Sequence, residues 1–544
     1  MYLILIEKEN HFRMKKILAI IFLLIIVGSQ TACKKFLETT PTSFIAPQNY
    51  YNNPTDLQNA LNSVYSGLSS SAIYGNNWLS LNWSTDEMCN RNSTPSFLNY
   101  FYTSSEPTIY SFWQTAYQGI SNANYLLANI NKPLMDSTSR TIIQGQALFL
   151  RGYYYFLLVS NFGDVPLILN PIEDGSNNLN VKKTAKAVVY QQILADMKLA
   201  DTLLQNQTVK SLGYSGKITK TAIEGILARV CLFMAGHPVM DVSKYNDALF
   251  YINKVIMDGE HSLNPSYSQI FINYAADKYD TNESIWEIEF SGTSYSSSQE
   301  GQTGVGYGIS CNDLTIGLCY GQAVPTSKLF RLYGVDSTSL LTPKACLDTR
   351  RDWNCANYSW GSANTGTKTL LMNIYQYGMG KFRREYEVVM PKSKNFSPEN
   401  FPVLRYADIL LMQAEAENEL NGPTAIAYNA INQVRRRGFG FPLNVANVIS
   451  DVPSGLSKSA FRSFIQDERA RELCGETLRR LDLIRWGLLI NNVQGLLPDI
   501  SVNYPSGVIS LGLASKYVSQ KDTLFPIPST EMSVNKLLVQ NGGW

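Results

Sequence analysis

The chain of 544 residues is long enough for one large lobe or several ordinary domains, and it carries 46 basic against 44 acidic side chains. The formal net charge of +2 provides no strong field for binding nucleic acid, and three histidines disfavour His-rich metal sites and imidazole chemistry. The 32 tyrosines and 8 tryptophans, in a chain with 17% charged residues, favour surfaces for neutral, polar, flat-faced ligands.

The first 32 residues have the pattern of an export signal. Three basic residues, Arg13, Lys15 and Lys16, precede an apolar run at residues 17–27. This run is shorter than the roughly 20 residues that a membrane-spanning helix needs, and no later run approaches that length. We therefore predict a signal peptide at residues 1–32, with translation starting at Met14 rather than Met1.

A cysteine follows the signal directly. The small residues that lead into Cys33 resemble the lipobox of bacterial lipoproteins, in which the cysteine thiol is acylated and becomes the mature N-terminus. The alternative is an ordinary secretory signal that is cut nearby and leaves Cys33 without a role. The mature chain has 42 acidic and 42 basic side chains, so acyl chains rather than a basic patch would hold it to a membrane.

Seven further cysteines leave an odd number in an exported chain, so at least one thiol is free or pairs between molecules. Two pairs are close enough in sequence for small disulfide loops, Cys311 with Cys319 and Cys346 with Cys355. No CxxC motif occurs, and we predict no metal site and no cofactor.

Apolar residues recur at the helical period over much of the chain. They predict two helical hairpins of tetratricopeptide (TPR) size, one formed by residues 218–235 and 243–257 and the other by residues 405–420 and 424–437. Residues 283–290 alternate apolar and acidic side chains like a strand. The predicted fold is mainly α, with TPR-like stacked helical hairpins and a loop-rich, short-strand region that binds the ligand.

This pattern divides residues 33–544 into two halves. The N-terminal half, 33–280, is predicted to be helical and to contain a ligand loop at 69–108. The C-terminal half, 281–544, has a loop and strand insert at 281–390, helices at 400–490 and a C-terminal tail.

Sugar binding calls for an aromatic plate beside amide, carboxylate or guanidinium groups. The two loop-rich regions supply such a set, which we predict to bind ligand: Trp78, Trp83, Asp86, Asn90, Arg91, Asn92, Tyr295, Tyr307 and Tyr320. The alternative for each aromatic side chain is a place in the core, because large aromatic residues are usually mostly buried.

No catalytic residue is predicted. Asp86 and Glu87 are the acidic pair beside the ligand loop, but adjacent carboxylates seldom face one bond together, as a glycosidase would require. The charged cluster of residues 467–485 is interpreted as structural. Its predicted ion pairs on a helix are Asp467 with Arg471 and Glu476 with Arg480.

Several segments in a fixed order resemble the SusD/RagB family of outer-membrane lipoproteins from Bacteroidetes. They are CKKFLETTP, ALFLRGYYYFLLVSNFGDVPL, LRYADILLMQAEAENELNG, AINQVRRRG, DERARELCGETLRRLDLIRWG, LFPIPSTEM and QNGGW. The resemblance implies a TPR-like core, a lipid anchor facing the cell surface, and partnership with a SusC-like TonB-dependent outer-membrane transporter. It also implies capture of a glycan or similar polar nutrient for import, without cleavage.

This chain departs from the family in two places. Glu38 is the nearest acid after Cys33, where an acidic pair often marks surface export. After Asp86 and Glu87 the starch-binding relative has sugar-stacking tryptophans, whereas this chain continues with Cys89 to Asn92, so starch is not implied. A glycoside hydrolase, or a scaffold or lid that binds only the transporter, remains the alternative function.

Overall fold

The computed structural model describes residues 11–20, 50–91, 94–172, 180–214, 216–292, 300–334, 345–361, 366–503 and 512–544. Residues 53–544 form one compact unit and residues 1–52 another. In the latter, residues 11–20 are helical and exposed. No helix in the described ranges combines the length and apolar character needed to cross a membrane.

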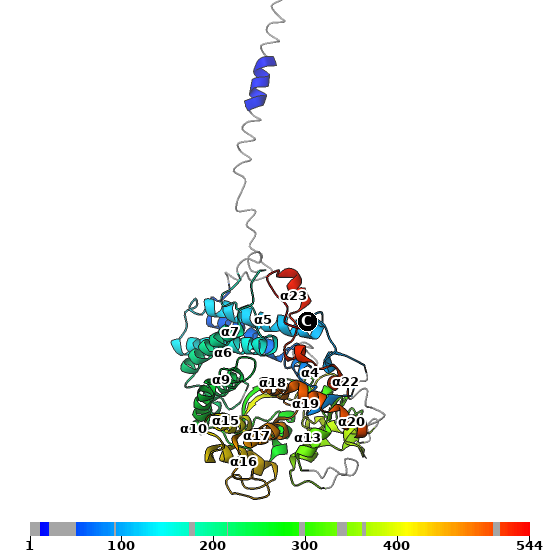
Figure 1. The fold of residues 1–544 in the computed structure, drawn as a ribbon. Coiled ribbons are helices and arrows are strands. Elements are labelled where there is room, and N and C mark those ends of the chain that lie inside the picture. Colours follow the sequence, from blue (N-terminus) through cyan, green and yellow to red (C-terminus); the bar gives the residue numbers. More distant parts are fainter. Residues whose placement is uncertain are drawn as a thin grey trace, which may run out of the picture. The chain divides into compact units, whose positions relative to one another are not determined.

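Helices dominate the compact unit, and the fold is mainly α as the sequence predicts (Figure 1). The α-helices are α3 (Pro54–Ser69), α4 (Asn77–Leu81), α5 (Pro107–Ala128), α6 (Ser137–Phe162), α7 (Lys186–Leu203), α8 (Val209–Leu212), α9 (Lys220–Ala235), α10 (Lys244–Asp258), α11 (Tyr267–Ala275), α12 (Thr303–Gly306), α13 (Ser327–Leu332), α14 (Arg350–Asn354), α15 (Tyr406–Asn421), α16 (Ala425–Gly438), α17 (Lys458–Leu473), α18 (Arg479–Arg485), α19 (Leu489–Gln494), α20 (Leu497–Asn503), α22 (Leu513–Tyr517) and α23 (Ser529–Val534). The short 3₁₀ helices are η2 (Phe97–Asn99), η3 (Ile374–Gln376), η4 (Arg384–Tyr386) and η5 (Gln520–Thr523).

Both predicted helical hairpins are present, as α9 with α10 and α15 with α16. Two of these four helices begin at a capping threonine. Thr219 accepts a hydrogen bond from the Ala222 amide at the start of α9, and Thr424 accepts one from the Ala427 amide at the start of α16. Gly259 ends α10 in the left-handed conformation, which glycine adopts without strain.

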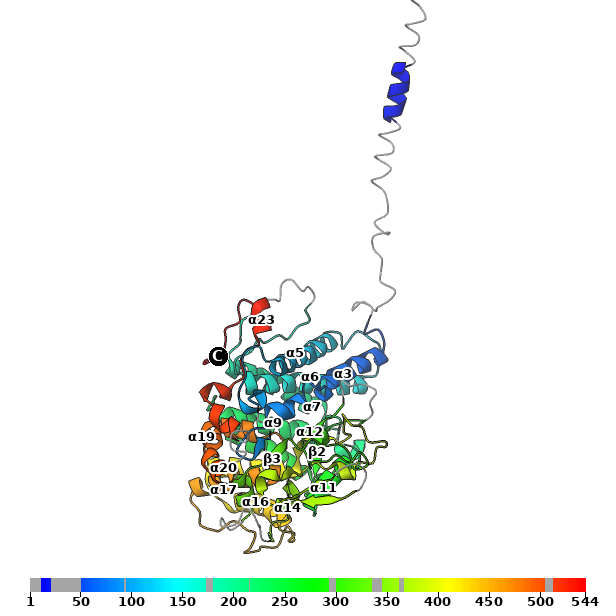
Figure 2. The same ribbon diagram turned by 90° about the vertical axis from the view of Figure 1, so that its right-hand side faces the viewer.

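The helices pack as successive neighbours, α3 on α5, α5 on α6, α6 on α7, then α9, α10 and α15 to α17. Figures 1 and 2 show α5, α6 and α7 in the upper part of the unit and α16 and α17 at its lower end. Close approach depends on small residues: a Cβ at Gly119 of α5 would collide with the ring of Tyr154 of α6. The N-terminal helices therefore meet through tightly packed apolar and aromatic side chains.

The strands form four antiparallel pairs in the described part of the chain. They are β1 (Met88–Asn90) with β3 (Ala323–Pro325), β2 (Ser284–Ile288) with β8 (Phe401–Arg405), β4 (Cys355–Ala356) with β7 (Gly378–Met379), and β5 (Tyr358–Trp360) with β6 (Lys368–Leu370). The predicted strand at 283–290 is thus β2. All five residues of β2 are buried. Its acidic side meets protein rather than water, because Asn400 donates to Glu287 and Arg405 donates to Glu283, the residue before the strand.

All seven cysteines of the described residues are free thiols, so neither of the possible small disulfide loops is formed. Cys311 and Cys319 do lie opposite each other in an antiparallel backbone bridge. Their thiols donate to different backbone carbonyl oxygens, those of Asp313 and Tyr307, at 3.3 and 3.5 Å.

Candidate functional site

The two loop-rich regions meet through the pairing of β1 with β3. Asn90 lies opposite Ala323, and the backbone amide of Arg91 donates to the carbonyl oxygen of Gln322 at 2.9 Å. Residues more than 200 positions apart in the sequence therefore share one short ladder, and it brings Arg91 beside Gln322, two positions after Tyr320.

Arg91 is half-buried, and its guanidinium group donates to the carbonyl oxygens of Gln376 and Tyr377 at 2.8 and 3.3 Å. Both bonds come from the same terminal nitrogen of the guanidinium group. They fix the direction of the side chain across β1, β3 and η3.

Tyr320 is 56% exposed, whereas the preceding residue, Cys319, is buried in the bridge with Cys311. Successive side chains in extended backbone point to opposite sides, so the tyrosine ring faces outward. The exposed Gln376 and the half-buried Gln322 lie beside Arg91 through the hydrogen bonds above. We call Arg91, Tyr320, Gln322 and Gln376 the Arg91–Tyr320 face.

The other aromatic residues of the predicted set that the structure describes lie in the core. Trp78 and Trp83 are 4% and 2% exposed, and Tyr307 is 3% exposed. Trp78 donates from its indole nitrogen to Thr477, and the rings of Trp83 and Tyr307 lie 4.4 Å apart. These three rings are covered by protein, so no ligand stacks on them in this conformation, and the core alternative applies to them.

Asp86 and Asn90 are also buried. Both carboxylate oxygens of Asp86 accept from Arg479 at 2.7 and 2.8 Å, and one also accepts from Lys328 and Asn492. Burial alone would raise the pKa of Asp86, but Arg479 and Lys328 outweigh it and hold that pKa well below its ordinary value. Asp86 therefore anchors the root of the ligand loop to α18.

Glu87 has the opposite electrostatics. It is 2% exposed, its carboxylate accepts from the amide of Gly475 at 3.0 Å, and burial raises its pKa to about 8. One ionised carboxylate beside one neutral carboxyl is a pairing that acid–base enzymes use. Because both groups are buried, neither faces a space in which a glycosidic bond could lie.

Three further predictions fall outside the described residues: lipidation of Cys33 and ligand binding by Asn92 and Tyr295.

The sequence prediction did not include Gln322 and Gln376, because amides in loops carry no periodic signal. The sequence prediction also did not distinguish exposed aromatic side chains from those that bond to other residues of the protein. Trp360, for example, donates from its indole nitrogen to Glu385 at 2.9 Å, and the ammonium of Lys368 lies 4.7 Å from its ring centroid. The ring of Trp360 therefore has its polar partners within the protein, and we interpret it as a structural residue of β5 that packs against β6.

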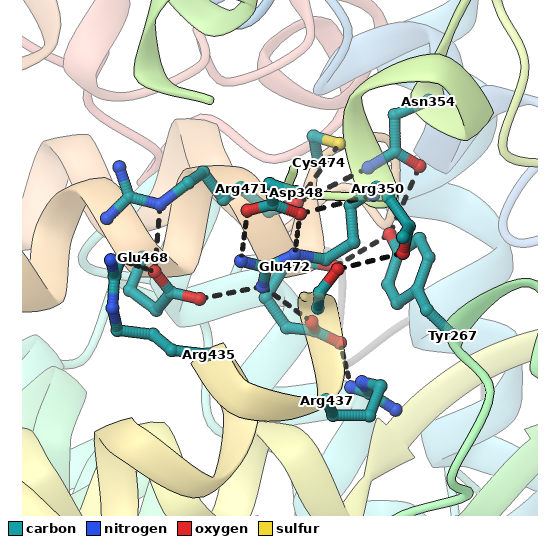
Figure 3. Close-up of polar contacts among 12 residues, drawn as sticks. Tyr267, Asp348, Arg350, Asn354, Arg435, Arg437, Glu468, Arg471, Glu472 and Cys474 are labelled. Carbon is teal, nitrogen blue, oxygen red and sulfur yellow. Dashed lines mark hydrogen bonds and ion pairs between the residues drawn. The ribbon is translucent and has the colours of Figure 1, made fainter. Parts of the chain in front are cut away.

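The charged cluster flagged in the sequence forms a buried ion-pair network (Figure 3). Glu468 of α17 accepts from Arg350 at 2.7 Å, from Arg471 at 2.8 Å and from Arg435 at 2.9 Å. Burial alone would raise the pKa of Glu468, but the three arginines outweigh it and lower that pKa.

One turn further along α17, Glu472 accepts from three arginines on three other elements, at 2.6 to 3.1 Å: Arg350 of α14, Arg405 of β8 and Arg437 of α16. Glu472 is completely buried. Each carboxylate is matched by guanidinium donors, which is the arrangement of a structural network. The structural interpretation of the cluster agrees with these contacts.

The predicted partners within this cluster were wrong. Arg471 pairs with Glu468 rather than Asp467, and Glu476 pairs with Lys381 and Arg405. The i, i+4 rule describes exposed helices, whereas here the carboxylates point into the protein and meet arginines from other elements.

The fold is thus a layered helical protein with an exposed polar and aromatic face at a junction of short strands. Two family models match the chain: one described as the SusD family over residues 282–544, and one described as starch-binding associating with outer membrane over residues 35–232. The chain belongs to the SusD/RagB family.

Similar proteins agree along nearly the whole length. A SusD-like protein of Formosa agariphila is 25% identical, with 97% of this chain and 98% of the relative aligned. The crystal structure of a SusD homolog from Bacteroides thetaiotaomicron superposes with a TM-score of 0.82 at 29% identity, over 92% of this chain and 98% of that one. A laminarin-binding SusD-like protein superposes with a TM-score of 0.67 at 22% identity, over 91% and 100% of the two chains, which shows the shared fold.

Proposed function

We propose that this protein is an outer-membrane-anchored binding protein that captures an oligosaccharide or similar polar nutrient and passes it to a SusC-like TonB-dependent transporter. Family membership supports the general role, and one family model is described as starch-binding associating with outer membrane. A structural relative named for laminarin binding supports a glycan as the ligand. The partner transporter is inferred from the family resemblance.

The observation that carries the proposal is the Arg91–Tyr320 face. Its exposed ring offers a flat apolar plate for the C–H face of a sugar, and the side-chain amides of Gln322 and Gln376 offer donors and acceptors for the hydroxyls at the rim. Capture before transfer needs only modest affinity, roughly micromolar to millimolar, or about −8 to −4 kcal/mol.

The anchor we propose is an acylated Cys33. The compact unit begins at Asn53. The intervening chain of about 20 residues can span at most roughly 65–70 Å when fully extended, which limits how far Asn53 can lie from an anchored Cys33. Release of the protein from membranes after Cys33→Ser, with retention in wild type, is the expected result of a cell-fractionation experiment.

We propose that the bound glycan is not cleaved, since the acidic pair beside the face is buried and engaged with Arg479 and Gly475. Incubation with a glycan panel separates this role from a glycoside hydrolase. Reducing ends that accumulate with time would contradict it.

Calorimetry on the same panel tests the site. Tyr320→Ala should weaken binding of the preferred glycan at least about tenfold, a loss of about 1.4 kcal/mol. The matched control is Phe250→Ala on α10, where an aromatic side chain is similarly exposed, at 60%. Equal affinity of both variants for the ligand would remove the Arg91–Tyr320 face as the site, and no heat with any glycan would favour a scaffold that binds only its transporter.

A further inference from the structure

A pocket of about 300 Å³, separate from the Arg91–Tyr320 face, lies between α5, residues 166–172 and the C-terminal α23. Figures 1 and 2 both show α23 beside α5 in the upper part of the unit. Its walls are mostly apolar and include Trp113, Ile120, Pro166, Ile168, Val181 and Leu538. None of these residues belongs to the Arg91–Tyr320 face.

The pocket is preformed, because side chains of its lining bind the backbone across it. Tyr117 donates from its hydroxyl to the carbonyl oxygen of Pro166 at 2.8 Å, and Asn124 donates to that of Ile168 at 2.9 Å. Asn535 donates to the carbonyl oxygen of Val181 at 2.8 Å. These three donors hold the walls and are therefore already engaged.

One acidic residue in the lining is left without such a contact. Glu531 of α23 is half-buried in the pocket, and in the described part of the chain no side chain or amide donates to its carboxylate. The nearby hydroxyl of Tyr117 is committed to Pro166. Partial burial raises the pKa of Glu531, and a cation beside the carboxylate would offset the cost of that burial.

We propose that this pocket binds an alkylammonium group, with the alkyl chain against the apolar wall and the ammonium at the carboxylate of Glu531. The charge complements the single acid, and a compact ammonium has three donors to satisfy. A guanidinium has five donors in a planar fork and would need further acceptors with full charge, whereas Glu531 is the one acid among the described residues of the lining. A lysine side chain has the required chemistry, as does a free aliphatic amine.

The test compares ligands that differ only in the charged group. N-acetyl-lysine N-methylamide and N-acetyl-norleucine N-methylamide share the same alkyl stem, and only the first carries an ammonium. Titrations followed by saturation-transfer NMR should show at least a tenfold preference for the lysine compound in wild type. Glu531→Gln should abolish that preference. Equal binding of the two compounds to wild type, or an unchanged preference in the variant, would overturn the proposal.

Pentylammonium distinguishes the two sources of the same chemistry. If it binds more tightly than the capped lysine, the pocket takes a free amine; if it binds more weakly, the pocket takes a lysine of a polypeptide. Either result supports an alkylammonium site.

Asp277→Asn is the matched control, since Asp277 is exposed and the substitution changes net charge equally. It should leave the preference for the ammonium unchanged. Among the described residues no group donates a hydrogen bond to the Glu531 carboxylate, so Glu531→Gln should not lower the thermal midpoint. Glycan binding at the Arg91–Tyr320 face should also be unaffected, which separates failure of this site from failure of the proposed nutrient-binding role.

Discussion

The two ends of the compact unit are stabilised differently. Where α6 meets α5 and α7, contacts are mostly apolar and aromatic, and the pair of Arg151 with Asp196 shares no residue with another ion pair in the described part of the chain. Around α14, α16 and α17, carboxylates and arginines form a connected buried network. Apolar packing tolerates partial loss because neighbouring side chains relax. A buried ionic network requires every partner, because each group removed leaves an uncompensated charge.

The largest effect should follow from breaking the network at its centre. Glu472→Gln leaves Arg350, Arg405 and Arg437 with one negative charge fewer in a buried place. We expect the free energy of unfolding to fall by about 3–5 kcal/mol, measured by urea denaturation. A loss below about 1 kcal/mol would mean that the network is not more demanding than surface ion pairs.

A cavity in the apolar end should cost somewhat less. Leu150 of α6 is completely buried, and Leu150→Ala should lower the free energy of unfolding by about 2–5 kcal/mol, depending on how far its neighbours close the gap. Leu134→Ala is the control, because Leu134 is 96% exposed. Similar losses in both variants would show that burial does not determine the effect.

Solution pH should act on buried carboxyls that lack a cation. The pKa of Glu87 is about 8 in the folded protein, against 4.5 as its ordinary value. The folded state therefore keeps a proton that the unfolded state releases, and this contribution to stability is present below about pH 4.5 and lost as pH rises to about 8. The slope is at most about 1.4 kcal/mol per pH unit.

Glu87→Gln should flatten that slope, measured by urea denaturation at several values between pH 5 and pH 8. Part of the slope should remain, because burial also raises the pKa of Glu399 to about 8, and Glu399→Gln in addition should reduce it further. If the slopes of wild type and the single variant coincide, Glu87 is ionised in the folded protein.

The smallest effect is expected at an exposed ion pair between α15 and α17. Glu419 pairs with Arg462, whose side chain is 41% exposed, and with Lys458, whose side chain is 45% exposed. Glu419→Gln should change the free energy of unfolding by no more than about 1 kcal/mol in the same denaturation experiment. A loss as large as that of Glu472→Gln would remove the distinction between buried and exposed pairs.

The helices could be predicted from the sequence because the apolar period and the end signals act locally. Thr219, Thr424 and Gly259 each determine a helix end through their own short-range contacts. The partners of Glu472 could not be predicted in this way. They come from α14, α16 and β8, and only the tertiary fold brings them together.

The candidate site shows the same limit of local sequence signals. Arg91 and Tyr320 carry suitable chemistry, and the fold leaves Tyr320 exposed and pairs the backbone of Arg91 with Gln322, two positions further along. Trp78 and Trp83 carry equally suitable chemistry, but Trp78 lies in α4 with its ring stacked on Phe112, and Trp83 packs against Tyr307. Depth below the surface depends on what packs above a residue, and a loop sequence without periodicity contains no local measure of it.

The ion pair of Asp86 with Arg479 fixes one point of the 69–108 segment, and Arg91 lies five residues beyond it. If ligand binds at the proposed Arg91–Tyr320 face, substitutions at positions 91 and 320 would change what that face recognises without altering the pair of Asp86 with Arg479. The same fold could then bind a different ligand after a few substitutions of exposed side chains, with its buried ion pairs unchanged.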